Sequence, residues 1–313
     1  MFCSDDRAPR ELLEQGHMNY IVKKAIRHGM DPILAIQMAT ANPADYFRLS
    51  EKQGAIAVGH RADLVVIDNF KKFNIKMVFK RGKLVAKDGK MIIPIKSKKH
   101  PRVPHSMNVK KIHQHAFSVP AFGKKIRVIE LVKDQIITNE LIVTPKVEDG
   151  YIKSDIKRDI IKIAVIERHK ATGNICVGFV KGFGLQRGAI ASTIAHDSHN
   201  IIVVGVKKKD MMVAVHALIK AKGGIVVVDN QKVVELLSLP IAGLMSPDPI
   251  EDIAKEKEKL IFAAKKLGSK IHDPFQSMSF LSLPVIPKLK ITDMGLVDVD
   301  KFGFVDLILG LNF

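Results

Sequence analysis

The chain has 313 residues, of which 47% are apolar and 26% are charged, and its 50 Lys and Arg against 32 Asp and Glu give a net charge of +18. This composition is typical of a soluble globular protein of about two domains and excludes a mainly disordered chain. No apolar run approaches the ~18–20 residues of a membrane span, which excludes a transmembrane protein.

The cellular compartment of the protein can be inferred from its first residues and its cysteines. The N-terminus lacks the basic-then-apolar order of a signal peptide, and the only cysteines are Cys3 and Cys176. Both features indicate a cytoplasmic protein. The basic excess could serve a nucleic-acid partner. The lysines are scattered and no aromatic residues are interleaved with them, so a solvated surface is favoured over a nucleic-acid interface.

Residues 1–50 are predicted to be helical. A helix is expected over Leu12–His28, and Asp31 followed by Pro32 predicts the N-cap and first residue of another. Asn42 and Pro43 predict a third helix start of the same kind.

Residues 51–95 show the pattern of strands instead, with turn residues between them. The expected strands form a small antiparallel meander and are Ala55–Val58, Ala62–Ile67, Ile75–Phe79 and Lys83–Ala86. Residues 96–125 follow as a basic linker, since the stretch between Gly89 and Ile129 has ten Lys or Arg and no acidic residue.

Residues 126–313 are predicted to form a second domain of mixed α/β type. Its buried strands are expected at Ile160–Ile166, Ile175–Val180, Ala189–Ala195, Ile201–Val206 and Ile225–Val228, and its helices at Asp210–Ala221 and Pro249–Leu267. For the second helix, Asp248 is the predicted N-cap, Glu251 completes a capping box, and Gly268 marks the end.

An acidic pair near the N-terminus is the first candidate site. Asp5 and Asp6 directly precede a helical segment. One carboxylate of such a pair can bind a cation or transfer a proton while its neighbour orients it. Taken alone, however, adjacent aspartates near a terminus are more often a helix cap or solvated acids.

A polar segment between two apolar strands is the second candidate. If the strands form a hairpin, His196, Asp197, Ser198 and His199 project from one end of a rigid sheet, where they could ligate a metal, relay protons or bind a purine. The structural alternative is a turn in which Asp197 and Ser198 bond their own backbone. Phe183, between two glycines, could stack on a base or equally be a core residue.

Several segments of the chain together resemble a known family. They include Cys3-Ser4-Asp5-Asp6, Gly16-His17, Asp31-Pro32, Gly54-Ala55-Ile56, Ala62-Asp63-Leu64-Val65, Lys181-Gly182-Phe183-Gly184, Ala195-His196-Asp197-Ser198-His199, Leu239-Pro240-Ile241-Ala242-Gly243 and Asp273-Pro274-Phe275. The first five resemble the closing part of the amidohydrolase superfamily. The later ones resemble the C-terminal domain of its adenine deaminase family.

The resemblance implies a fold and an activity. The expected fold is α/β: the terminal fragment of a (β/α)8 amidohydrolase barrel, a small β-sandwich segment, and a C-terminal mixed α/β domain. The implied reaction is hydrolysis of adenine to hypoxanthine and ammonia in purine salvage. It implies a pair of divalent ions, manganese or iron, with Asp5 as one ligand and proton carrier and Asp6 orienting it. Phe183 and the segment His196–His199 would contact adenine.

The same resemblance implies that most of the catalytic barrel lies outside this chain. The seven preceding barrel strands and the other metal ligands are expected on an N-terminal half or on a homo-oligomer partner. We therefore expect a C-terminal portion from a truncated or split reading frame, inactive alone and with residues 1–50 loosely held. The alternatives are a non-catalytic purine-binding or regulatory remnant that pairs with an intact enzyme and, less favoured, a nucleic-acid-binding protein.

Overall fold

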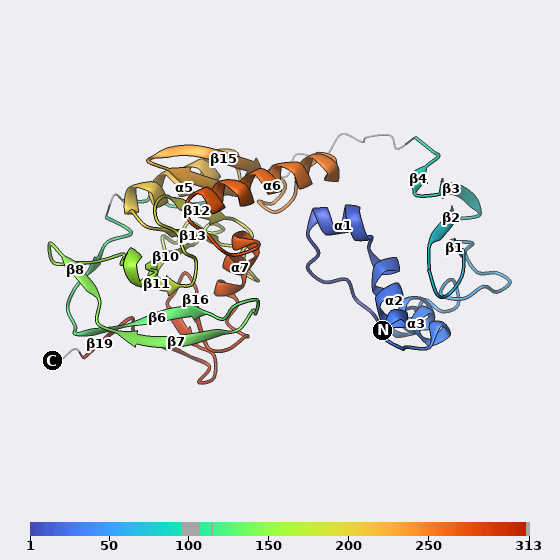
Figure 1. Ribbon diagram of the computed structural model, residues 1–313, viewed down its shortest axis with the longest axis horizontal. Coiled ribbons are helices and arrows are strands. Elements are labelled where there is room, and N and C mark those ends of the chain that lie inside the picture. The colour runs from blue at the N-terminus through green and yellow to red at the C-terminus, as the bar shows by residue number, and fades with distance from the viewer. Residues whose placement is uncertain (95–106, 114, 311–313) are drawn as a thin grey trace. The chain divides into compact units, whose positions relative to one another are not determined.

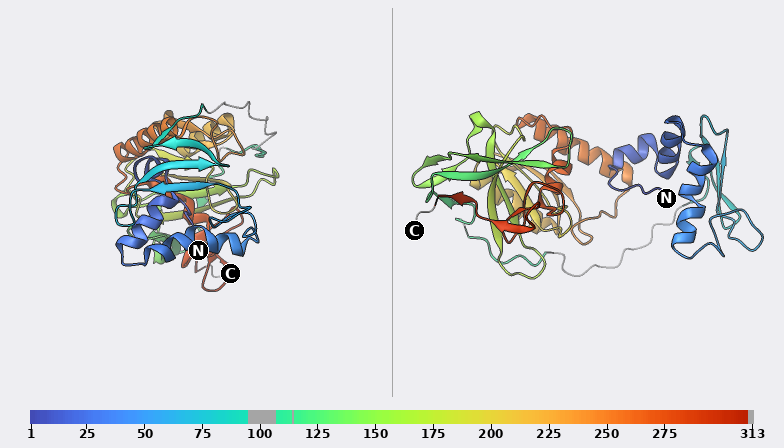
Figure 2. Two further views of the ribbon diagram at one scale, coloured as in Figure 1. Left: turned by 90° about the vertical axis from the view of Figure 1, so that its right-hand side faces the viewer. Right: turned by 90° about the horizontal axis from the view of Figure 1, so that it is seen from below.

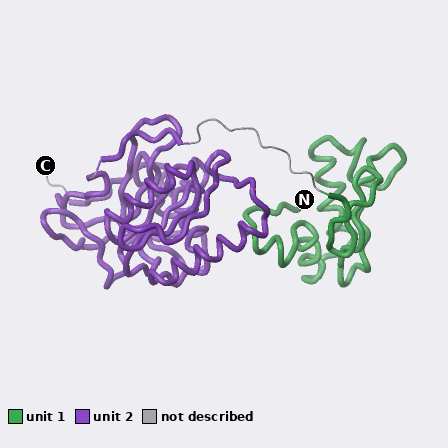
Figure 3. The backbone as a smooth tube through the Cα atoms, turned by 90° about the horizontal axis from the view of Figure 1, so that it is seen from above, with its two compact units in different colours: residues 1–100 green, residues 101–313 purple. Residues whose placement is uncertain are grey.

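The computed structural model describes residues 1–94, 107–113 and 115–310. The chain divides into two compact units, Met1–His100 and Pro101–Phe313, drawn in green and purple in Figure 3. Each unit buries its own apolar side chains and combines helices with strands, which confirms the predicted α/β class. Unit 1 and unit 2 are described separately below.

The helices of unit 1 are α1 Pro9–Gln15, α2 Met18–Arg27, α3 Pro32–Ala39 and α4 Ala41–Tyr46 (Figure 1). The expected single helix Leu12–His28 is wrong. The chain breaks at Gly16, whose φ of 99° cannot continue a right-handed helix. After the break, the Asn19 side chain accepts the His17 N–H at 2.9 Å, at the start of α2.

One of the two predicted N-caps in unit 1 is confirmed. The Asp31 carboxylate accepts the Leu34 N–H at 2.9 Å, and Pro32 is the first residue of α3. The prediction for Asn42 is wrong, because α4 begins at Ala41, two residues before Pro43, with Thr40 at the cap. Thr40 itself donates its hydroxyl to the Ile36 carbonyl at 2.7 Å, so it ends α3 as well as preceding α4.

The sheet of unit 1 is the predicted antiparallel meander. Its strands are paired in chain order and are β1 Leu64–Ile67, β2 Ile75–Lys80, β3 Lys83–Lys87 and β4 Lys90–Met91. The expected strand Ala55–Val58 is irregular instead, with Ile56 90% and Val58 104% exposed. No strand of the described residues pairs with it, and an extended segment needs a partner for its N–H and C=O groups.

The core of unit 1 is small. Val22, Ala35 and Phe73 are its buried members, with half-buried side chains packed around them. A cavity of about 740 Å³ lies among α2, α3, α4 and β1. Apolar burial supplies most folding stability, and this core supplies little of it; that residues 1–50 are loosely held stays a prediction.

Unit 2 contains a nine-stranded sheet of order β15-β14-β12-β13-β10-β11-β6-β19, with β7 also paired to β6. Its strands are β6 Lys125–Leu131, β7 Thr138–Val143, β10 Ile160–Ile166, β11 Ile175–Lys181, β12 Ala189–Ser192, β13 Ile201–Gly205, β14 Gly224–Asp229, β15 Lys232–Ser238 and β19 Ile308–Leu309. Two small sheets accompany it, made of β5 Val119–Pro120, β8 Lys146–Glu148 and β9 Tyr151–Lys153, and of β16 Leu289–Ile291, β17 Leu296–Asp298 and β18 Gly303–Val305. The five predicted buried strands are all present, with ends shifted by up to three residues.

Helices cover both faces of the large sheet (Figures 1 and 2). Helix α5 Lys208–Ala221 packs on the face that carries Ala164 and Ile166. Helices α6 Ile250–Lys266 and α7 Pro274–Ser279 pack on the face that carries Ile163 and Val165. Successive strand residues point to opposite faces, and helices cover both faces of this sheet. Every residue of β10 is therefore buried.

Two details of unit 2 differ from the sequence predictions. Helix α6 has Pro249 at its N-cap, so the prediction for Asp248 is wrong; Asp248 instead accepts the Ser246 hydroxyl at 2.7 Å. The expected basic linker over 96–125 lies partly outside the described residues. Within it, Phe117 is fully buried in the core of unit 2, so this part of the chain is not a free connector.

A buried lysine in β16 makes the stability of unit 2 depend on pH. Lys290 is fully buried, its Nζ donates to the Ile136 carbonyl at 2.9 Å, and burial lowers its pKa to about 8. An unfolded lysine titrates near ~10.4, so between pH 8 and that value the unfolded chain holds a proton that the folded chain has lost. The free energy of unfolding should therefore rise across this window.

We expect Lys290→Met to raise the free energy of unfolding at pH 7 by about 2 kcal/mol, because a buried charge with no acidic partner among the described residues is removed. At pH 10.5 the gain should vanish, since the wild-type amine is then neutral in the folded state. Urea unfolding at both pH values measures this, with the exposed Lys265→Met on α6 as the control. An equal effect of Lys290→Met at both pH values would contradict the assignment.

Candidate functional site

The segment His196–His199 lies at the end of a β-hairpin, as predicted. Strands β12 and β13 pair antiparallel, with Ala189 opposite Gly205 and Ser192 opposite Ile202. Asp197 and Ser198 are exposed at the turn, and His196 and His199 are half-buried. We call residues 196–199 the tip. Its base is fixed by the sheet, while its polar side chains remain accessible.

Helix α7 and the short 3-10 helix Phe280–Ser282 hold His196 from one side. The His196 N–H donates to the Ser279 carbonyl at 3.0 Å, and the Ser282 hydroxyl donates to the His196 carbonyl at 3.2 Å. The Phe280 ring lies against the imidazole, with centroids 4.9 Å apart and planes tilted by 34°. The His199 ring meets His196 edge-on at 5.5 Å, so the three rings form a continuous row.

A buried arginine holds the tip from the other side. Arg168 is 1% exposed and lies two residues after the end of β10. Its guanidinium donates through Nε to the His199 carbonyl and through Nη2 to the Ala242 carbonyl at 3.0 Å. Gly243 leaves room for it, because a Cβ there would lie 2.8 Å from the guanidinium. Arg168 therefore ties the tip to the turn at residues 242–243.

Two further contacts extend this support. His169 Nε2 contacts the Ser198 carbonyl at 2.7 Å. Asn200, at the foot of the tip, donates its side-chain amide to Asp293 at 3.0 Å. The backbone carbonyls of Ser198 and His199 and the side chain of Asn200 are thus bonded by residues distant in the sequence.

The protonation of His199 follows from its surroundings. Burial lowers the pKa of His199, and the nearby His196 and Arg168 lower it further, while Asp197 acts in the opposite direction. The ring is therefore neutral at pH 7. Its Nδ1 accepts the Ala195 N–H at 3.3 Å, which leaves the proton on Nε2. His199 can thus present a hydrogen-bond donor to a ligand at neutral pH.

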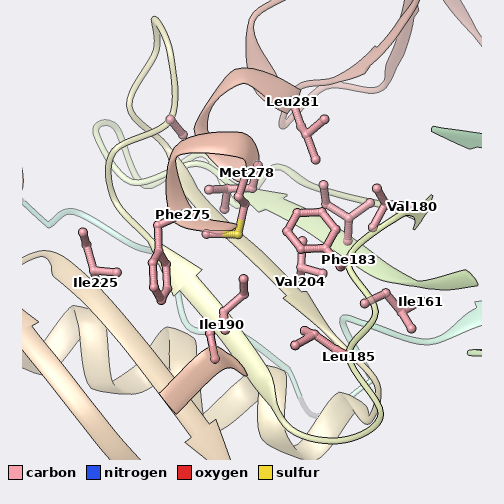
Figure 4. Packing of buried hydrophobic residues seen from close by; sticks show 14 of the residues in the cluster. Ile161, Val180, Phe183, Leu185, Ile190, Val204, Ile225, Phe275, Met278 and Leu281 are labelled. Carbon is pink, nitrogen blue, oxygen red and sulfur yellow. The ribbon is translucent and has the colours of Figure 1, made fainter. Parts of the chain in front are cut away.

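Phe183 is a core residue rather than a stacking surface, which corrects the predicted contact with a base. Its side chain is fully buried among Ile161, Val204 and other apolar residues (Figure 4). The Asp159 carboxylate accepts the N–H groups of Gly182 and Gly184 at 3.0 and 2.8 Å. This clamp on the two flanking glycines turns Phe183 inward.

Asp5 and Asp6 lie in unit 1, in the segment before α1, and both are exposed. Within the described ranges, no hydrogen bond or ion pair involves the Asp5 carboxylate, so its oxygens are available. Those ranges also contain no group of three or more His, Cys, Asp or Glu that could hold a metal ion. That Asp5 and the tip share one pocket stays a prediction, because they belong to different units.

The sequence predictions missed Arg168, His169 and Phe280 as residues that contact the tip. The available signal for the first two was the polar run Glu167-Arg168-His169 directly after the mainly apolar strand β10. Nothing local distinguished Phe280 from the other phenylalanines.

In the part of the chain that the structure describes, we also find no helix with the length and apolar character to cross a membrane.

Comparison with known proteins gives matches along almost the whole chain. Residues 135–303 match the adenine deaminase C-terminal domain, and residues 1–85 match the amidohydrolase family. Adenine deaminase of Methanothrix thermoacetophila is 47% identical over 310 residues, which cover 99% of this chain and 54% of that protein. Adenine deaminase of Desulfatibacillum aliphaticivorans is 49% identical over 308 residues, covering 98% and 54%. The chain spans about half the length of the curated relatives it matches.

Proposed function

This chain belongs to the adenine deaminase family, and on that premise we propose that it is the C-terminal portion of an enzyme that hydrolyses adenine to hypoxanthine and ammonia in purine salvage. The observation that carries the proposal is the family match over residues 135–303, which includes the whole tip and its supports from α7 and β10. The two cysteines, neither of which forms a disulfide, support a reducing cytoplasmic setting.

We assign each segment of the chain to a part of this proposed enzyme. Residues 1–50 would be the end of the last barrel strand and the helices of an amidohydrolase barrel, and residues 51–95 strands of its small β-sandwich. Residues 96–125 would connect these to the adenine deaminase C-terminal domain at 126–313. The match of residues 1–85 to the amidohydrolase family supports the first two assignments.

The proposed enzyme uses a pair of divalent ions, manganese or iron, with most ligands outside this chain, on an N-terminal half or a homo-oligomer partner. Asp5 fits as one ligand, because its exposed carboxylate offers the oxygen donors that such ions accept. When bound, the ions would lower the pKa of water to near neutrality.

The residues of this chain would act on protons and on the purine. Asp5 would accept the proton lost by the water that bonds to C6 of adenine, and would return a proton to the amino group as it leaves as ammonia. Asp6 would orient Asp5. The tip residues His196, Asp197, Ser198 and His199 would contact the purine, an assignment supported by their exposure on a rigid hairpin.

A chimera tests the proposal. This chain replaces the matching 54% of the Methanothrix thermoacetophila enzyme, and the chimera is assayed for adenine-dependent ammonia release with added manganese. We expect release by the chimera and none by the chain purified alone. A chimera that unfolds cooperatively yet releases no ammonia would contradict the proposal and favour the non-catalytic alternative. Release by the chain alone would show that the metal ligands are misplaced.

A further inference from the structure

The row of rings at the tip offers an aromatic surface among exposed polar groups. Phe280 is half-buried beside His196, unlike the enclosed Phe183. Next to these rings stand the exposed Asp197 carboxylate and the His199 ring with its proton on Nε2. No described residue bonds to the Asp197 carboxylate in the structure. The tip thus combines a π surface with one acceptor group and one donor group.

We propose that Phe280 is the residue on which adenine stacks, and that Asp197 and His199 read its edge. This assignment rests on the proposed function. Adenine presents an amino donor beside a ring-nitrogen acceptor at N7. Asp197 can accept from the amino group while His199 Nε2–H donates to the ring nitrogen.

The same arrangement distinguishes substrate from product. In hypoxanthine an oxygen acceptor replaces the amino donor at C6, and this oxygen would face the Asp197 carboxylate. Two acceptors facing each other cannot form a hydrogen bond, and the carboxylate charge would repel the oxygen. The tip is therefore expected to bind adenine more tightly than hypoxanthine and to favour release of the product.

The proposal is tested by ligand titration of the full chain labelled with 15N-histidine, which reports on His196 and His199 by NMR. We expect adenine to shift both imidazoles, and Phe280→Leu to weaken adenine binding about tenfold, the effect typical of losing a base-stacking ring. Phe280→Tyr keeps the ring and should bind as the wild type does. The control is Phe122→Leu, a ring 70% exposed next to β5. Unchanged affinity in Phe280→Leu would overturn the stacking assignment.

Asp197→Asn tests how the edge is read. An amide can donate to the hypoxanthine oxygen, so the preference for adenine over hypoxanthine should fall about tenfold, while the shape of the tip is kept. An unchanged ratio of the two dissociation constants would overturn the role of Asp197.

The same variants in the chimera separate this inference from the proposed function. Phe280→Leu should raise KM for adenine about tenfold with kcat nearly unchanged, because stacking is equal in the ground and transition states. Ammonia release with an unchanged KM in Phe280→Leu would refute the stacking role and leave the function standing. If Phe280→Leu fails to fold, the volume-conserving Phe280→Met replaces it, with the same criteria.

Discussion

Replacing Asp5 by asparagine in the chimera is expected to lower kcat for adenine deamination about a thousandfold, with little effect on folding. The loss combines two effects, because an amide cannot accept the proton of the attacking water and is a poor metal ligand. Loss of a positioned general base alone typically costs ~10²–10⁴ in rate. Because Asp5 is exposed and outside any helix, stability should stay the same. Steady-state ammonia release and thermal unfolding of both proteins measure the two quantities.

Asp6→Asn is the matched control for Asp5→Asn. The two residues are adjacent and both exposed, and the substitution removes the same charge. If Asp6 orients Asp5 without touching the reacting atoms, its loss should cost about tenfold, the lower range for groups that position a ligand. Full activity of Asp5→Asn, or a larger loss in Asp6→Asn than in Asp5→Asn, would show that the acidic pair is assigned wrongly.

Arg168→Met is expected to lower the free energy of unfolding of unit 2 by roughly 3 kcal/mol, and to disorder the tip. The methionine fills much of the space but leaves the His199 and Ala242 carbonyls without their donor. Each buried group left unpaired costs about 1–3 kcal/mol. The measurement is urea unfolding of the full chain followed by circular dichroism, with NMR of 15N-histidine reporting on the tip.

Arg187→Met supplies the comparison for Arg168→Met. Arg187 also pairs with an oxygen, the Asp229 carboxylate at 2.9 Å, but its side chain is 55% exposed. Exposed ion pairs contribute about 1 kcal/mol or less, so this substitution should be nearly neutral and should leave the tip signals in place. Equal destabilisation by both substitutions would mean that Arg168 does not organise the tip.

The sequence predicted five buried strands of unit 2 and the hairpin that carries the tip, because their signal is local. Runs such as Ile160–Ile166, apolar except for Lys162, and Ile201–Gly205 show the pattern of strands covered on both faces. The Asp31 cap was predictable for the same reason, since its partner is three residues away. The Ala55–Val58 strand failed because a strand also requires a neighbour, which no local pattern supplies.

The tertiary structure decided which side chains surround the tip. The order of the large sheet places β10 beside β13, so Arg168 at the end of one strand reaches His199 before the start of the other. In the same way Asp159 turns Phe183 into the core and α7 brings Phe280 to His196. Residue type and spacing thus determined the strands, the acidic pair and the polar turn of this protein. Which side chains meet at the turn depended on strand order and helix packing, because contacts between distant residues form only when the chain closes on itself and buries its apolar surface.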